Sequence, residues 1–232
     1  MPTATRKATV DDVLGWLEAA GTRKQRDGLL RYGIVAPKAF GVSVGTLHGL
    51  AKRAGRDHAL ALALWKTGWY EARLLTAWID EPERVTVAQM DRWAADFDNW
   101  AVCDTLCFHL FDRVPARWGR VAPWARRREE FVRRAAFALL ASLAAHDKEA
   151  PDAAFLKCLP LIERGADDDR NFVKKGVSWA LRLTGRRSPA VWAASMALAT
   201  RLAASKDPSS AWVGRDALRD LGKPALRRTF GR

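Results

Sequence analysis

The stretch Phe131-Val-Arg-Arg-Ala-Ala-Phe repeats the pattern of Trp69-Tyr-Glu-Ala-Arg-Leu-Leu. In both, an aromatic residue is followed by small or basic residues at the third and fourth places, and apolar residues then resume. Helix pairs that recur about every 33 to 47 residues are typical of tetratricopeptide, HEAT and armadillo proteins. The aromatic residues that open the expected helices are spaced by 31, 31, 41 and 40 residues, and they are Trp69, Trp100, Phe131, Phe172 and Trp212.

The sequence therefore predicts an all-α protein, a curved α-solenoid of degenerate HEAT-like repeats. It has no sustained alternation of β-branched residues, and the tetratricopeptide consensus is missing. We expect one domain over residues 1–232, with about the first 30 residues as an N-terminal helical cap. The outer helices of two pairs are expected at Val87–Ala94 and Ala153–Ile162, and the second helices would line the concave surface. Breaks between helices are expected at Ala36-Pro37, Glu81-Pro82, Ala122-Pro123, Ala150-Pro151 and Ser188-Pro189.

The charge is distributed unevenly along the chain. Residues 1–112 carry 14 basic and 14 acidic side chains, whereas residues 113–232 carry 25 and 12, so that the whole net charge of +13 lies in the second half. A polyanionic partner would bind that half. The alternative without a binding partner is that the excess charge only keeps the protein soluble.

Several classes of protein are disfavoured. No apolar run approaches the roughly 20 residues of a membrane span, and no apolar region of a signal peptide follows the N-terminus. Three cysteines suggest buried thiols in a reducing cytoplasm rather than disulfides. No metal-ligand spacing, phosphate-binding glycine loop or serine nucleophile motif is present. We therefore expect a cytoplasmic protein without metal or organic cofactor, and a monomer by default.

Asp104 has unusual neighbours on its expected helix. At about 100° per residue, Trp100, Asp104, Phe108 and Phe111 share one face. A carboxylate among rings is costly unless it is paired or used. It could cap the helix, although Asp98 or Asn99 is better placed. It could also form a buried ion pair with Arg134 or Arg73, lie in solvent, or act as an active-site carboxylate beside a positively charged intermediate.

The helix at Phe172 predicts the clearest ligand-binding surface. Its core stripe is Val173, Val177, Ala180 and Thr184, and the opposite side carries Lys175, Trp179, Arg182 and Arg186. A tryptophan within a cationic stripe suits a phosphate backbone with a nucleobase or sugar. Otherwise, Trp179 packs under a neighbouring helix and the cations are only solvated.

Arg134 also points away from a core stripe, on the helix at Phe131. It could bind a phosphate, pair with Asp104, or be an ordinary surface arginine. Two charged segments precede these helices. Asp167-Asp168-Asp169 is placed to cap the helix at Phe172, and Arg120 to Glu130 is expected to form a loop leading into the helix at Phe131.

Together, these residues resemble the AlkD-like family of DNA alkylation repair proteins, which are HEAT-like-repeat DNA glycosylases. The resemblance runs from about Tyr32 to Leu221. It is carried by Tyr32-Gly-Ile, Phe40-Gly-Val-Ser-Val, Asp57-His-Ala-Leu-Ala-Leu-Ala-Leu-Trp65, Glu71-Ala-Arg-Leu-Leu, Asp96-Phe-Asp-Asn-Trp-Ala-Val-Cys-Asp104, Glu130-Phe-Val-Arg-Arg-Ala-Ala-Phe and Arg170-Asn-Phe-Val-Lys-Lys-Gly-Val-Ser-Trp-Ala-Leu-Arg182.

The resemblance implies a catalytic Asp104, four residues after Trp100, with Trp179 on the lesion side and Arg134 on the DNA. Arg133, Lys174, Lys175, Arg182 and Arg186 are expected as further DNA contacts. Many relatives carry a second acid directly after the tryptophan, where this chain has Ala101.

The implied reaction is hydrolysis of the N-glycosidic bond of cationic N3- or N7-alkylpurines in double-stranded DNA. Two alternatives are a non-catalytic HEAT-repeat protein that recognises bent or branched DNA, and a protein-interaction scaffold.

Overall fold

The computed structural model describes residues 6–230, and this part of the chain contains helices and no strand. The predicted all-α class and HEAT-like helical repeats are confirmed. The chain divides into two compact units. Unit 1 comprises the chain as far as Met90 together with Asp98–Pro115, and unit 2 comprises Asp91–Phe97 and everything from Ala116 onward. The single domain over residues 1–232 stays a prediction.

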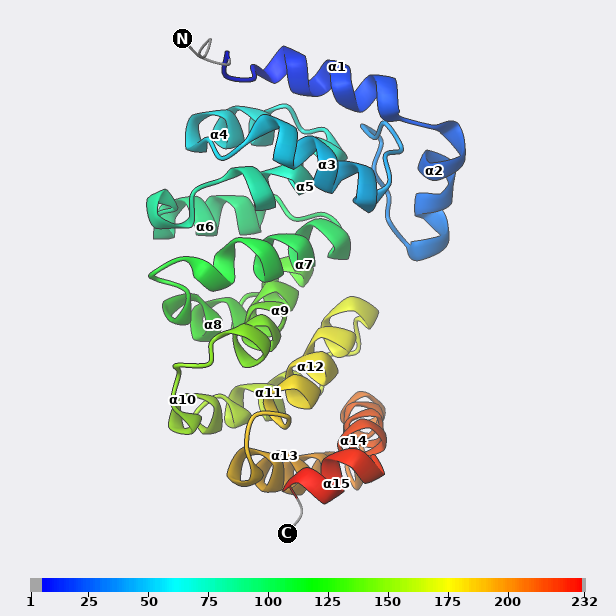
Figure 1. Cartoon of the computed structure of the whole chain (residues 1–232). Coiled ribbons are helices and arrows are strands. Elements are labelled where there is room, and N and C mark those ends of the chain that lie inside the picture. The colour runs from blue at the N-terminus through cyan, green and yellow to red at the C-terminus, as the bar shows by residue number, and fades with distance from the viewer. Residues whose placement is uncertain (1–5, 231–232) are drawn as a thin grey trace. The chain divides into compact units, whose positions relative to one another are not determined.

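Figure 1 shows the helices of each unit in chain order. Unit 1 contains α1 (Val10–Ala20), α2 (Arg23–Gly28), η1 (Leu29–Tyr32), α3 (Val44–Ala54), α4 (His58–Lys66), α5 (Tyr70–Ile79), η2 (Pro82–Arg84), α7 (Trp100–His109) and η3 (Phe111–Arg113). Helix α6 (Val87–Ala95) contributes residues to both units. Unit 2 contains α8 (Trp118–Ala125), α9 (Glu130–His146), α10 (Asp152–Leu156), α11 (Leu159–Gly165), α12 (Asn171–Thr184), α13 (Pro189–Ala203), α14 (Pro208–Leu221) and α15 (Pro224–Phe230).

The helices that carry the repeated aromatic residues stack on one another within each unit, as the repeat predicts. Trp212 does not open its helix, however, because α14 begins at Pro208 and Trp212 is its fifth residue. Helix α5 packs between α3 and α7 in unit 1, with α4 as its outer partner. In unit 2, α12 packs on α9 and α14, while α8 and α13 are the outer partners of α9 and α14. Leucine and aromatic side chains close both cores, including Leu47, Leu75 and Leu106 in unit 1 and Trp124, Phe137 and Phe155 in unit 2.

Two predicted boundaries are wrong. Pro123 lies inside α8, so that Arg120 to Glu130 is helix in its first half and a loop only from Arg126. Pro123 is the sixth residue of this eight-residue helix, so the helix forms without the hydrogen bond that a backbone N–H at position 123 would donate to the carbonyl oxygen of Gly119. The outer helix expected at Ala153–Ile162 is two helices, α10 and α11, and Pro160 lies in the first turn of the second.

A buried carboxylate holds the long loop of unit 1 in place. Glu71, on the first turn of α5, is fully buried. Its oxygens accept hydrogen bonds from the backbone N–H groups of Phe40 (2.9 Å), Gly41 (2.7 Å) and Val42 (3.2 Å). Gly41 adopts φ 81°, and a Cβ there would lie 2.2 Å from the carbonyl oxygen of Thr22. The loop is thereby fixed on one side to α5 and on the other to α2.

Glu71→Gln should lower the free energy of unfolding by about 2–3 kcal/mol, because an amide donor replaces an anionic acceptor opposite three donors. Denaturant unfolding followed by circular dichroism measures this. The matched control is Glu163→Gln, which breaks an exposed ion pair with Arg201 and should cost less than about 1 kcal/mol. Equal losses in the two variants would contradict the anchoring role of Glu71.

Candidate functional site

Helix α7 presents Asp104 on a half-exposed face. Asn99 caps the helix, since its side chain accepts a hydrogen bond from the Val102 N–H at 3.0 Å, as the sequence predicts. Trp100, Asp104 and Phe108 are half-buried on successive turns, whereas the other side of the helix is buried in the core of unit 1. The cap and open-solvent interpretations of Asp104 are therefore wrong. The aromatic neighbours one turn before and one turn after it are confirmed.

Phe111 does not belong to this face. It lies in η3, where the chain has left the α-helix, and its side chain is fully buried. The helical projection fails here because α7 ends at His109, one residue before the C-cap Leu110.

The ring of Trp100 is held by a backbone contact that the sequence does not reveal. Its indole N–H donates to the carbonyl oxygen of Tyr32, in η1, at 2.8 Å. The two residues are 68 positions apart and the acceptor is a main-chain atom, so neither periodicity nor residue type signals the contact. The indole is thus oriented beside Asp104 by a second element of unit 1.

The thiols of α7 do not compete with Asp104 as reactive groups. Cys103 and Cys107 are fully buried and form no disulfide. Burial raises the pKa of the Cys107 thiol well above its ordinary value, and a hydrogen bond and charge from Cys103 and the negative charge of Asp104 raise it further. Because only a thiolate is a strong nucleophile, the Cys107 thiol is a poor nucleophile at neutral pH.

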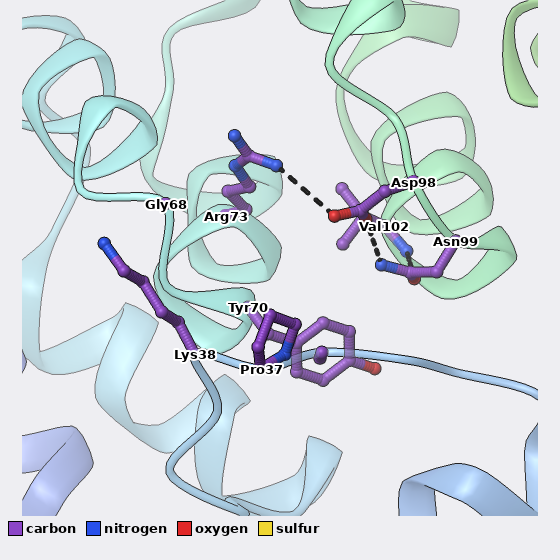
Figure 2. A pocket seen from close by; sticks show the side chains of 9 residues that line it. Pro37, Lys38, Gly68, Tyr70, Arg73, Asp98, Asn99 and Val102 are labelled. Carbon is purple, nitrogen blue, oxygen red and sulfur yellow. Dashed lines mark hydrogen bonds and ion pairs between the residues drawn. The ribbon is translucent and has the colours of Figure 1, made fainter.

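A pocket of about 220 Å³ opens beside the start of α7 (Figure 2). Its lining includes Lys38 from the loop, Tyr70 and Arg73 from α5, and Asp98 and Asn99 before α7. Figure 2 shows Arg73 and Asp98 pointing toward one another, and their closest charged atoms are 3.9 Å apart. Burial, with the negative charges of Glu71 and Asp98, raises the pKa of the Tyr70 phenol, so it stays protonated. Asp104 does not line this pocket.

Helix α12 carries the predicted core stripe and the predicted cations. Val173, Val177, Ala180 and Thr184 are all fully buried, which confirms the stripe. On its other sides, Lys175 is exposed, and Lys174, Trp179 and Arg182 are partly exposed.

Acidic and aromatic residues of α14 engage three of the predicted cations. The Lys174 ammonium lies 5.4 Å from the centre of the Trp212 ring. Asp216 lies 3.4 Å from Arg182, and Asp220 lies 2.5 Å from Arg186. These ion pairs could not be predicted from the sequence. Each acid lies 34 residues after its arginine, and the two meet only because α14 packs on α12.

Arg134 is buried rather than on the surface. Its side chain is covered by α12, where a Cβ at Gly176 would lie 3.4 Å from the Arg134 Cγ. Its guanidinium donates to the carbonyl oxygen of Phe172 at 2.5 Å. The surface-arginine interpretation is therefore wrong. The side chain joins α9 to the first turn of α12.

Asp168 binds arginines instead of capping α12. The cap position is Arg170, which makes no side-chain capping bond. Asp168 is nearly buried and lies 2.6 Å from Arg170 and 3.2 Å from Arg133. The predicted capping role of the acidic cluster is wrong, because pairing with two arginines outweighs a helix-dipole contact. Arg133, a predicted DNA contact, is partly neutralised in this way.

No group of three or more histidine, cysteine, aspartate or glutamate side chains in residues 6–230 is arranged to hold a metal ion. In the same range, no helix combines the length and the apolar character that crossing a membrane requires.

The comparisons with known proteins identify the family. A model of the family described as DNA alkylation repair enzyme matches residues 14–221. The chain belongs to this family of DNA alkylation repair enzymes. No curated protein sequence matches it.

A solved structure also resembles this member of the alkylation repair family. It was reported among "a new family of proteins related to the HEAT-like repeat DNA glycosylases with affinity for branched DNA structures". The similarity has a TM-score of 0.76 at 17% identity and covers 93% of this chain and 97% of that one. At this identity the match establishes the HEAT-like fold alone.

Asp168→Asn should destabilise unit 2 in a pH-dependent way. Burial opposes ionisation of Asp168, but hydrogen bonds from Arg170 and the charges of Arg170 and Arg133 lower its pKa below the ordinary value of 3.8. A lowered folded-state pKa stabilises the protein above the unfolded-state pKa, and the stabilisation disappears as the pH falls through the folded value.

The variant should therefore lose about 1–2 kcal/mol of unfolding free energy at pH 7 and much less near pH 2. Denaturant unfolding at both pH values measures the difference. Asp167→Asn is the control, since Asp167 is exposed and 4.0 Å from Arg133. A loss for Asp168→Asn that is constant with pH would refute the ion-pair interpretation.

Proposed function

We propose that this alkylation repair protein is a monofunctional DNA glycosylase for cationic N3- and N7-alkylated purines in double-stranded DNA. The observation that carries the proposal is the half-exposed Asp104 one turn after an indole that Tyr32 holds in place. Family membership supports DNA repair, and the excess of positive charge in the second half of the chain supports a polyanionic partner.

In the proposed reaction, the bond between the sugar C1′ and the purine N9 breaks, and its electron pair neutralises the cationic base. Positive charge then develops at C1′ as an oxocarbenium-like species. The Asp104 carboxylate stabilises this charge and orients the water that attacks C1′. Alkylation has already made the base a good leaving group, so the reaction needs no strong general acid.

We propose that Trp100 contacts the cationic base and contributes about 1–2 kcal/mol through cation–π attraction, and that Trp179 also contacts the DNA. Lys175 is the proposed phosphate contact, with Lys174, Arg182, Arg186 and Arg133 contributing less because neighbouring side chains engage them. Arg134 acts through α12, whose first turn it holds. We also propose that the protein works as a monomer in the cytoplasm.

A second candidate is non-catalytic recognition of branched DNA. It is favoured by the affinity reported for the family of the similar solved structure. Incubating the protein with methylated duplex DNA and measuring free 3-methyladenine and 7-methylguanine separates the candidates. Release supports the glycosylase, and binding without release supports the second candidate. If the protein neither releases the bases nor binds the DNA, the result supports a protein-interaction scaffold.

Asp104→Asn should slow the release of 7-methylguanine at least ~100-fold, because the carboxamide cannot neutralise the developing cation. DNA affinity should be retained. Single-turnover release and a binding titration measure the two effects. Asp98→Asn, an exposed acid two residues before the start of α7, is the matched control and should release the base at nearly the wild-type rate. A wild-type rate for Asp104→Asn would remove Asp104 from the mechanism.

Lys175→Ala should reduce the slope of log K against log salt by about 1, since one phosphate contact is lost. Fluorescence anisotropy between 50 and 200 mM salt measures it, a range in which the slope is about linear. Lys157→Ala removes another exposed lysine of unit 2, after α10, and should leave the slope unchanged. Identical slopes for Lys175→Ala and the wild-type protein would argue against the contact.

A further inference from the structure

Unit 1 exposes three large apolar side chains within one short segment. Leu30, Tyr32 and Val35 are 68%, 66% and 68% exposed, although they lie within six residues of one another. We call these three residues the apolar edge. Single exposed apolar side chains are normal on a protein surface, but a local group of them marks a binding surface.

The backbone of the apolar edge is fixed. Gly33 adopts the left-handed conformation at φ 69°, and its N–H donates to the Leu30 carbonyl oxygen at 3.0 Å. The next residue, Ile34, is buried and its N–H donates to the Leu29 carbonyl oxygen at 3.1 Å. The Tyr32 carbonyl oxygen accepts the indole N–H of Trp100. An edge ordered in this way loses little conformational entropy when it binds a partner.

The segment that carries the apolar edge is rich in exposed basic side chains. Residues 23–38 contain five basic side chains and one acidic side chain, while residues 1–112 as a whole are neutral. The basic residues Arg23, Lys24, Arg26, Arg31 and Lys38 are all exposed. The single acid, Asp27, lies 3.3 Å from Arg23. The segment around the apolar edge therefore carries a net charge of +4 in a half of the chain that is neutral as a whole.

This combination fits a polyanion that also offers flat apolar surfaces. Nucleic acid has both, because phosphates bind the cations and nucleobases stack on aromatic and apolar side chains. In a fully paired duplex the base faces are covered by their neighbours. They become available where a base pair is open, and apolar side chains that enter such a step are a known mode of DNA binding.

We propose that the apolar edge binds unstacked nucleobases of DNA, with Tyr32 as the stacking residue and Leu30 and Val35 beside it. This inference rests on the proposed DNA partner, but it does not require catalysis. The link from Tyr32 to Trp100 places base contact next to the helix that carries Asp104. The apolar edge thus gives the protein a preference for DNA with an open base pair.

The test compares two DNA ligands of equal length and charge, a fully paired duplex and a duplex with one unpaired, bulged base. The variant carries Leu30→Ser, Tyr32→Ser and Val35→Ser. It should lose about tenfold in affinity for the bulged duplex, a loss typical of one stacked base, and less than twofold for the paired duplex. The matched control is Val44→Ser, which removes another exposed apolar side chain of unit 1.

A fluorescent 2-aminopurine at the bulge gives a second readout. Stacking on residue 32 should change its emission with the wild-type protein, with Val44→Ser and with Tyr32→Phe. The emission should not change with Tyr32→Ser. Retention of stacking by Tyr32→Phe would show that the ring, rather than the hydroxyl, makes the contact. Equal thermal unfolding midpoints of all variants are expected, because the replaced side chains are exposed.

Four results would overturn the proposal. The triple variant could keep the preference for the bulged duplex, or lose both ligands equally. It could instead lose binding to vesicles containing phosphatidylserine, or lose self-association in sedimentation, with DNA binding unchanged. All these measurements concern binding, so a wild-type protein that prefers bulged DNA without releasing alkylpurines would refute the glycosylase and leave the apolar edge supported.

Discussion

The arrangement of unit 1 depends on the buried Glu71 carboxylate and the three backbone N–H groups that surround it. A buried anion is stable only when hydrogen bonds replace its water, and the loop at residues 40–42 supplies them. In the same loop, the Lys38 carbonyl oxygen accepts a hydrogen bond from the Tyr70 N–H at 2.9 Å. The chain between η1 and α3 is thereby fixed on α5, and η1 can present the Tyr32 carbonyl to Trp100. The orientation of the proposed catalytic face thus begins at a carboxylate that takes no part in the chemistry.

Local periodicity predicted what depends on one helix. The half-exposed face of α7 with Trp100 and Asp104, the Asn99 cap and the core stripe of α12 all follow from residue spacing along a single element. The burial of Arg134 and the pairing of Arg182 with Asp216 could not be predicted in this way, because they depend on which helix packs against which. The aromatic repeat predicted the stacking order of the helices but not their rotation about their axes, and the rotation decides which side chains meet.

The net charge of the second half overstates the cations that are available to DNA. Arg133 and Arg170 share Asp168, and acids of α14 lie against Arg182 and Arg186. An arginine already paired with a carboxylate must exchange that partner for a phosphate, so it contributes less binding energy than an exposed lysine such as Lys175. The paired arginines keep α12 in a fixed position against α9, α11 and α14. They therefore shape the surface more than they attract the polyanion.

The single carboxylate of α7 limits the chemistry that this face can perform. Glycoside hydrolases use two carboxylates, one of which protonates the leaving group while the other stabilises or attacks the sugar. Here the position after Trp100 is Ala101, and Asp104 is the only acid of α7. One anion can stabilise an oxocarbenium-like charge, but it cannot also act as a proton donor while it remains ionised. A neutral purine needs that proton to leave, whereas a purine alkylated at N3 or N7 does not. Under the proposed mechanism, the composition of α7 therefore favours lesions that already carry a positive charge.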